Sequence, residues 1–273
     1  MSDTSPPNEI TPPEGEERPS SPGSPRRRRN DPPTALQDLD FETVFVIFSS
    51  LFFFTLFWYF GRVPFFKAHL TEYPPASSFA PAYGFTYFVI SSVVLRMLLP
   101  MLCIVFVLKR RLSDFGFSIR GVGRGAWIYG LLFLSMLPLI FFAGTQSSFV
   151  EYYPQCRGLI RNNTITWTHL LIFELVYGIL FVSGESFWRG YMVFGTERTL
   201  GYYGVLFMVI PYAMSHYEKP FLETLGAFVA GSVLGILALR HRSFWLGVLV
   251  HWGVAISMDL MAMFRRGITI TGW

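Results

Sequence analysis

Long, uninterrupted runs of apolar residues constrain this chain more than any other feature of its sequence. A helix needs about 20 mostly apolar residues to cross the ~30 Å hydrocarbon core of a membrane. Lipid offers no hydrogen-bond partners to the backbone, so a spanning segment is either a helix or part of a closed barrel. The runs are continuous rather than alternating, which excludes a barrel. We therefore predict an all-α, polytopic helical membrane protein with about seven (six to eight) transmembrane helices, at residues 44–60, 85–108, 126–143, 169–194, 202–216 (a short one), 221–239 and 244–264.

The composition agrees with this class. Only 15% of the residues are charged, whereas soluble domains carry about a quarter. We expect membrane lipid as a partner, and no nucleic acid. Cys103 lies in a predicted span and Cys156 in a loop, which indicates neither a disulfide framework nor a metal cluster.

The first residues differ from the rest. Residues 1–38 are rich in Pro, Ser, Glu and Arg and hold almost nothing that can be buried, so we predict a disordered tail followed by a helical membrane domain at 39–273. Four consecutive arginines, residues 26–29, lie just before the first span. Positive charge beside a span stays in the cytoplasm, which predicts a cytoplasmic N-terminus. The positions of the basic segments 109–111 and 240–242 between the predicted spans agree with a cytoplasmic N-terminus. The basic pair 265–266 fits this orientation less well.

Ionisable side chains inside the predicted spans are the candidate functional residues. Such a group costs at least ~2.5–3.5 kcal/mol at the centre of the bilayer, and it usually faces the interior of the bundle. Most of these residues lie in the C-terminal half of the chain. They are Arg96, His169, Glu174, Glu185, Arg189, His216, His251 and Asp259.

Glu185 and Arg189 are four residues apart. On a helix this spacing places them on one face, in the order that favours an ion pair. In a low-dielectric bundle each charge makes the other tolerable. The pair is equally explained as a structural device that only holds the helix in register.

His216 is placed opposite Glu185 by a predicted hairpin. Both residues are about 15 positions from a turn at 200–201, so antiparallel helices bring them to the same depth, roughly 22 Å from the turn at 1.5 Å per residue. A carboxylate and an imidazole at one site can polarise a water molecule. Tyr212 lies one turn before His216 and can support the same site. A histidine that only packs in the bundle is the alternative.

His251 and Asp259 lie in the last predicted span. His251 can serve as a hydrogen-bond donor to a developing oxyanion. Asp259 is eight residues further, about 80° around the helix, so it either faces the same site or belongs to an interface near the end of the span. The chain has no His-Glu-x-x-His zinc motif and no glycine-rich serine motif, and Asp259 is the one aspartate in a predicted span.

The order of these elements resembles a known family. The CPBP family (CAAX prenyl protease and bacteriocin-processing, also called Abi) comprises intramembrane proteases, and its core is similar to residues 165–264 here. The residues that carry the resemblance are Glu185-x-x-x-Arg189-Gly190, Tyr212-x-x-x-His216 and His251 in a late span.

The resemblance implies hydrolysis of a peptide bond near the C-terminus of a membrane-tethered substrate, prenylated or carrying a sorting signal, in an integral membrane protein of the bacterial inner (plasma) membrane. It implies that Glu185 and His216 activate water, that Arg189 fixes the glutamate and that His251 faces the oxyanion. It implies no confirmed cofactor, although zinc is possible in this family.

Two positions depart from the family pattern. Gly184 stands where the family has the first of two glutamates, which is generally taken as the catalytic one, and Ala255 stands where an Asn or Asp is expected. Either Glu185 has taken over the role and Asp259 partly compensates, or the chain is a non-catalytic relative acting as a scaffold or bacteriocin-immunity protein. A small transporter or proton relay that uses the same groups is a further alternative.

Overall fold

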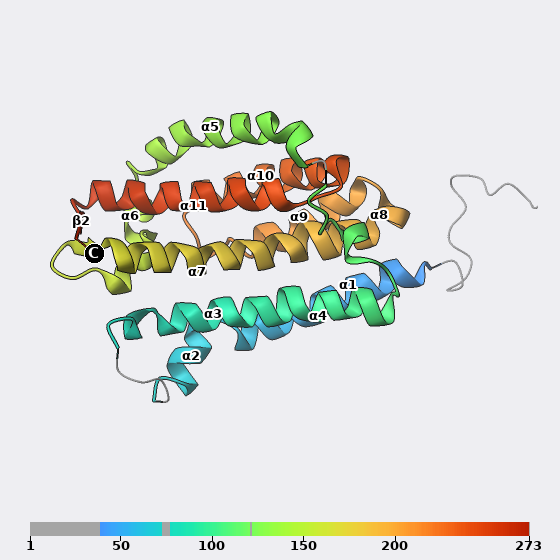
Figure 1. Cartoon of the computed structure of the whole chain (residues 1–273), viewed down its shortest axis with the longest axis horizontal. Coiled ribbons are helices and arrows are strands. Elements are labelled where there is room, and N and C mark those ends of the chain that lie inside the picture. Colours follow the sequence, from blue (N-terminus) through green and yellow to red (C-terminus); the bar gives the residue numbers. More distant parts are fainter. Residues whose placement is uncertain (1–38, 73–76, 121, 273) are drawn as a thin grey trace, which may run out of the picture. The chain divides into compact units, whose positions relative to one another are not determined.

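The computed structural model describes residues 39–72, 77–120 and 122–272, so the predicted tail at residues 1–38 lies outside the described residues. Residues Asp40–Trp273 form one compact unit. It is a bundle of helices that run roughly along a common direction (Figure 1). The prediction of an all-α membrane protein is confirmed.

Within the described ranges, six helical segments are long and apolar enough to cross a membrane, and a shorter apolar helix, α9 (Tyr203–Met214), lies among them. This agrees with the predicted number of about seven. The six segments are α1 (Phe41–Phe60), Ala80–Val107, α5 (Ala126–Ala143), Trp167–Leu200, α10 (Phe221–His241) and α11 (Trp245–Arg265).

Two of these segments are composite helices. The first contains two π-helical stretches, and Pro100 stands near the start of one of its α-helical parts. The second passes from an α-helix through a nine-residue π-helix into a further α-helix. The first comprises η2 (Ala80–Ala82), α3 (Tyr83–Val93), η3 (Val94–Leu98), α4 (Leu99–Leu102) and η4 (Cys103–Val107), and the second α7 (Trp167–Glu185), η8 (Ser186–Phe194) and α8 (Gly195–Leu200).

Short elements connect the spans. The two strands, each of three residues, pair in parallel, with Ile165 opposite Ile270. They join the start of α7 to the segment that follows α11 at one end of the bundle (Figure 1). The short elements are α2 (Val63–His69), η5 (Leu112–Phe115), η6 (Val122–Gly125), α6 (Ser147–Tyr152), η7 (Gln155–Leu159), β1 (Thr164–Thr166) and β2 (Thr269–Thr271).

The segment Trp167–Leu200 forms the centre of the bundle. Of the 18 residues in its apolar window, 61% are buried inside the protein. In the 18-residue window of α5, only 11% are buried. A helix whose apolar residues are mostly exposed faces lipid rather than other helices. The central segment therefore carries the residues that are best shielded from lipid, and α5 lies at the periphery, as Figure 1 shows.

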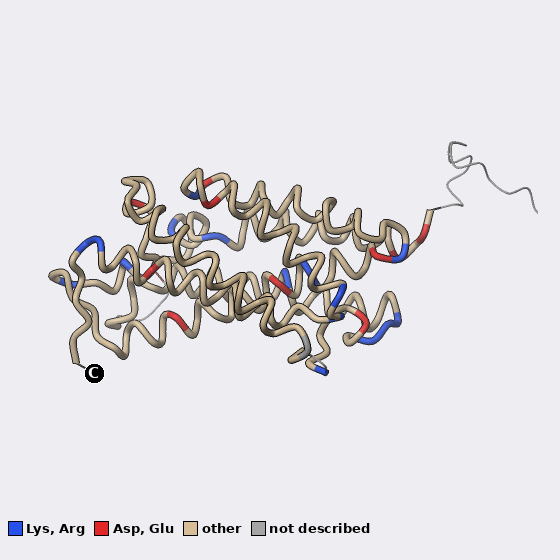
Figure 2. The backbone as a smooth tube through the Cα atoms, turned by 90° about the horizontal axis from the view of Figure 1, so that it is seen from above, with Lys and Arg blue, Asp and Glu red and all other residues tan. Residues whose placement is uncertain are grey.

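Charged residues gather toward the ends of the bundle, and a smaller group lies in its interior (Figure 2). At one end, ion pairs join Arg110 to Glu42 at 3.1 Å and Arg242 to Glu197 at 2.5 Å. The end at which α1 begins is thus held together by contacts between segments far apart in sequence.

The structure changes two predicted boundaries. The span expected at 169–194 belongs to a helical segment that continues to Leu200, and α9 ends at Met214, so His216 lies in the turn after the helix rather than within it. The predicted hairpin turn is present: Gly201 has a φ of +54°, a backbone conformation that glycine adopts without strain.

Candidate active site

The candidate site forms where α7 passes into η8. Glu185 is the last residue of α7, and all nine residues of η8 are buried. Runs of π-helix are rare and frequently occur at functional sites. The α-helix thus changes to a π-helix directly after Glu185, a buried carboxylate in the core of the bundle.

The carboxylate of Glu185 is 1% exposed and has two partners on one oxygen. Its Oε1 accepts hydrogen bonds from Arg189 Nη1 at 2.7 Å and from His251 Nδ1 at 2.8 Å. Its Oε2 has no hydrogen-bond partner among the described residues. A Cβ atom at Gly247 would lie 3.2 Å from Oε2, so this oxygen packs against α11. Glu185 thus links η8 to α11 through Oε1. Its Oε2 forms no hydrogen bond, and it is fully buried.

Arg189 is completely buried. Besides its bond to Glu185, its guanidinium lies over the ring of Tyr212, 4.3 Å from the centroid. A stacked aromatic ring stabilises a desolvated guanidinium by about 2 kcal/mol or more. The predicted ion pair of Glu185 and Arg189 is present, and its second contact anchors α9 to the same site.

His216 follows the end of α9 and is 8% exposed. Its Nδ1 lies 2.9 Å from the carbonyl oxygen of Tyr212. A carbonyl can only accept, so Nδ1 carries the proton and, in the neutral ring, Nε2 holds a lone pair. His216 is therefore fixed in the tautomer that can accept a proton.

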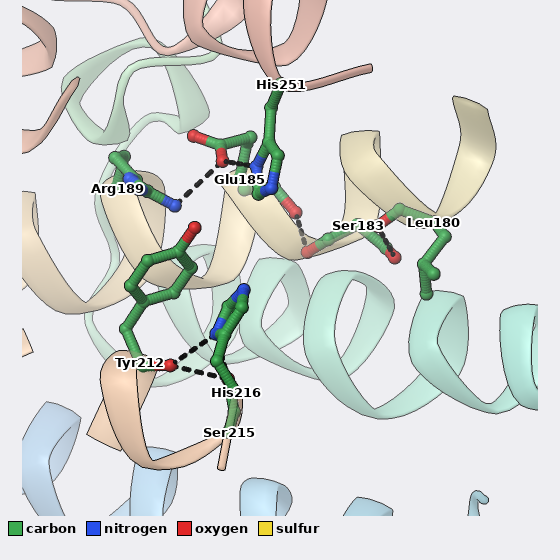
Figure 3. A network of polar contacts seen from close by, with 9 residues as sticks. Leu180, Ser183, Glu185, Arg189, Tyr212, Ser215, His216 and His251 are labelled. Carbon is green, nitrogen blue, oxygen red and sulfur yellow. Dashed lines mark hydrogen bonds and ion pairs between the residues drawn. The ribbon is translucent and has the colours of Figure 1, made fainter. Parts of the chain in front are cut away.

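His251, on α11, is fixed in the same way. Its Nδ1 donates to the carboxylate of Glu185, which leaves Nε2 as the acceptor of the neutral ring. Its ring also packs against Phe181, with 4.6 Å between centroids. In Figure 3 the rings of His251 and His216 enter the site from opposite sides, with Tyr212 beside them and its hydroxyl pointing toward Arg189.

These groups line one cavity of about 180 Å³. Its polar residues come from segments far apart in the sequence, and aromatic rings make up most of its remaining wall. The lining includes Arg96, Glu185, Tyr212, His216 and His251 together with Phe54, Phe57, Phe85, Phe88, Tyr177, Phe181 and Trp188. Two imidazoles of the cavity can form hydrogen bonds to the polar group of a ligand that reacts. The aromatic wall can pack against the apolar remainder of the ligand.

The structure brings together most of the predicted site residues and leaves one outside. Glu185, Tyr212, His216 and His251 line the cavity, and Arg189 bonds to Glu185 behind it. Asp259 does not line it. Its Oδ1 accepts from the backbone N–H of Gln155 at 2.9 Å, so it supports the loop between α6 and β1.

Two residues were not assigned to the site from the sequence: Arg96, which lines the cavity, and Gly247, which packs beside Glu185. Arg96 appeared only as one of several charged residues within spans, and Gly247 carried no signal at all. Arg96 comes from η3, whose distance in sequence from Glu185 hides their common cavity. Gly247 lacks a side chain and so leaves room for Glu185 Oε2. This contact arises from the packing of α11 on α7, which the sequence alone does not show.

Zinc fits this donor set poorly. A catalytic zinc ion usually takes three protein ligands and leaves a fourth position for water. Among the described residues no group of three His, Cys, Asp or Glu side chains is placed to hold a metal ion. His216 and His251 offer two nitrogens, whereas Glu185 is bonded to Arg189 and His251.

The fold and the site define a polytopic helical membrane protein whose cavity holds two imidazoles and a buried carboxylate. Residues 164–257 match the family model described as Rce1-like, type II CAAX prenyl endopeptidase. This part of the chain is therefore similar to that membrane protease family, and the match confirms the resemblance to the CPBP proteases. The match covers about a third of the 273 residues and includes every residue of the predicted site except Asp259. No curated protein and no solved structure gives a significant match to the chain.

Proposed function

We propose that this protein is an intramembrane endopeptidase that cleaves a membrane-tethered, prenylated or sorting-signal peptide near its C-terminus. One observation carries the proposal: two imidazoles with fixed tautomers share a cavity inside a membrane bundle, and one of them is bonded to a buried carboxylate. The family match supplies the reaction class.

In the proposed reaction, a water molecule lies between Nε2 of His216 and Nε2 of His251. His251 takes a proton from the water as its oxygen attacks the scissile carbonyl carbon. The imidazolium that forms is stabilised by Glu185 through Nδ1, and it then returns the proton to the leaving nitrogen. His216 accepts a hydrogen bond from the attacking water and orients it. General base catalysis of this kind contributes about 10²–10⁴-fold to a rate.

This geometry favours different roles from those that the resemblance implied. Glu185 was expected to activate water with His216, but its Oε1 accepts hydrogen bonds from Arg189 and His251, and its Oε2 is fully buried beside the Cα of Gly247. We therefore propose Glu185 as the positioning residue of His251. His251, expected to face the oxyanion, becomes the base.

The test uses the full chain in lipid vesicles with a prenylated peptide whose cleavage separates a fluorophore from a quencher. We expect His251→Ala and His216→Ala each to reduce kcat/KM by at least about 100-fold. His169→Ala is the matched control, because His169 lies in α7 outside the cavity lining, where it bonds to Thr166 and stacks on Phe79. Full cleavage by both site variants would reject the proposal.

The alternatives give other results in the same vesicles. A non-catalytic scaffold binds the peptide and never cleaves it, whether or not the histidines are present. A transporter or proton relay shows pH-dependent flux across the vesicle membrane without any cleavage. Either outcome replaces the protease proposal.

We further propose a bacterial inner (plasma) membrane location with a cytoplasmic N-terminus. The basic segments beside the spans support this orientation. A single cysteine introduced at Arg111, in a variant whose two native cysteines are replaced, tests it. We expect a membrane-impermeant thiol reagent to label this position only in inverted membrane vesicles, and labelling in right-side-out vesicles would reverse the orientation.

A further inference from the structure

Arg96 is a buried cation without a carboxylate partner. It is 8% exposed, and its Nη1 donates a hydrogen bond to Ser92 Oγ at 3.3 Å. The other buried arginine, Arg189, has Glu185. A buried charge that lacks a partner is costly, above all within a membrane. Its presence therefore needs an explanation.

Aromatic rings surround the Arg96 guanidinium and offset a part of this cost. Its central carbon lies 4.9 Å from the ring centroid of Phe57, 5.4 Å from Trp188 and 5.8 Å from Phe187. Rings stabilise a cation but do not neutralise it. A positive charge remains in the wall of the cavity.

The donor of Arg96 that remains open to the cavity is Nη2. Nε is fully buried without a hydrogen-bond partner, whereas no described residue bonds to Nη2 and Arg96 lines the cavity. An ionised donor of this kind forms strong hydrogen bonds to a carboxylate oxygen. A Cβ atom at residue 184 would lie 2.9 Å from Nη2. Gly184 therefore leaves the space that Nη2 occupies.

Both carboxylates that line the cavity are bonded to other cations. Glu185 uses Oε1 for Arg189 and His251, and Glu218 pairs with Arg62. Glu185 acts on Arg96 electrostatically but forms no hydrogen bond to it. The position at which a second carboxylate would stand in the family is Gly184. Arg96 thus gives the wall of the cavity a positive charge to which no carboxylate is bonded.

We propose that Arg96 binds the free α-carboxylate at the C-terminus of the substrate peptide. This inference rests on the proposed function, because it assumes that a peptide enters the cavity. The charged Nη2 group donates to a carboxylate oxygen, and the aromatic wall accommodates the side chains of the last residues. A cavity of about 180 Å³ holds only a short peptide end, so an anchored carboxylate places the scissile bond a few residues from the C-terminus.

The experiment measures binding and does not depend on cleavage. Full-length protein carrying His251→Ala is placed in phosphatidylcholine nanodiscs, and fluorescence anisotropy reports the binding of two prenylated peptides of identical sequence. One peptide ends in a free carboxylate and the other in a carboxamide. We expect the free acid to bind about 10–100-fold more tightly, the range that a hydrogen bond to a charged group provides.

Three variants assign this preference to Arg96. We expect Arg96→Gln to bind both peptides equally and Arg96→Lys to keep a part of the preference. Gly184→Ala should reduce the preference, because its Cβ atom displaces Nη2. Arg110→Gln is the matched control: Arg110 lies outside the cavity lining and pairs with Glu42, so its loss should leave the preference intact.

Two results would overturn the proposal. The first is equal binding of acid and amide by the protein with native Arg96, or an unchanged preference in Arg96→Gln that melts like its parent. The second is loss of the preference in nanodiscs that contain phosphatidylglycerol, which would assign Arg96 to a lipid phosphate. A wrong catalytic mechanism leaves these binding results unchanged, so the two proposals fail separately.

Discussion

Replacement of Glu185 by Gln tests the central contact of the site. The carboxylate can only accept, so it forces the proton of His251 onto Nδ1. A glutamine amide can turn its NH₂ group toward Nδ1, which moves the ring proton to Nε2 and directs a donor at the attacking water. Loss of the carboxylate that fixes a catalytic imidazole in its tautomer costs about 10⁴ in kcat. We expect E185Q to lose about that factor.

The same substitution separates catalysis from stability. Glu185 and Arg189 are both 1% exposed at their side chains, and removal of one partner from a buried pair costs about 3–5 kcal/mol, whereas replacement of both by apolar residues is often neutral. We therefore expect Glu185→Leu to be strongly destabilised and the double variant Glu185→Leu with Arg189→Met to recover most of the loss. Neither should regain cleavage.

The assay combines initial cleavage rates in vesicles with unfolding free energies in mixed micelles. E185Q should also show no further loss of rate when His251→Ala is added, because the two residues act as one unit. The reasoning is refuted if E185Q cleaves within about tenfold of the native rate, or if the double variant is as unstable as Glu185→Leu alone.

Three further predictions concern other parts of the structure. Gly247→Ala places a methyl group 3.2 Å from Glu185 Oε2, so we expect kcat to fall while unfolding changes little; an unchanged kcat would show that this contact does not position the carboxylate. Glu174 has two buried carboxylate oxygens without partners, so Glu174→Met should raise the unfolding free energy by about 1–3 kcal/mol, and a lower value would reveal a partner for this carboxylate. Asp40 caps α1 through a hydrogen bond from the Thr43 N–H at 2.9 Å, a bond that lowers the pKa of Asp40. The cap therefore stabilises the fold above the ordinary pKa of Asp, and its contribution is lost as the pH falls through the lowered value. Asp40→Ala should cost about 0.5–2 kcal/mol at pH 7 and nothing near pH 2, and a pH-independent cost in unfolding measurements would contradict this account.

The sequence by itself determined the class of fold and most of the site. Each span could be predicted from a local apolar run, because a helix in lipid must satisfy its own backbone and cover it with apolar side chains. The hairpin argument placed Glu185 and His216 at one depth, and the structure brings both to the same cavity. A charge inside a span is expensive wherever it occurs, so Arg189 and His251 could be identified as candidates without knowledge of their neighbours.

The tertiary structure decided which atoms meet. The carboxylate of Glu185 bonds to His251 on α11 rather than to His216. Asp259, on the same helix, accepts a hydrogen bond from the backbone N–H of Gln155 instead of lining the cavity. The approach of η3 to η8 placed Arg96 beside Gly184. Hydropathy fixes how deep a residue lies in a membrane but not its direction around the bundle, because that direction depends on the packing of side chains from several helices at once.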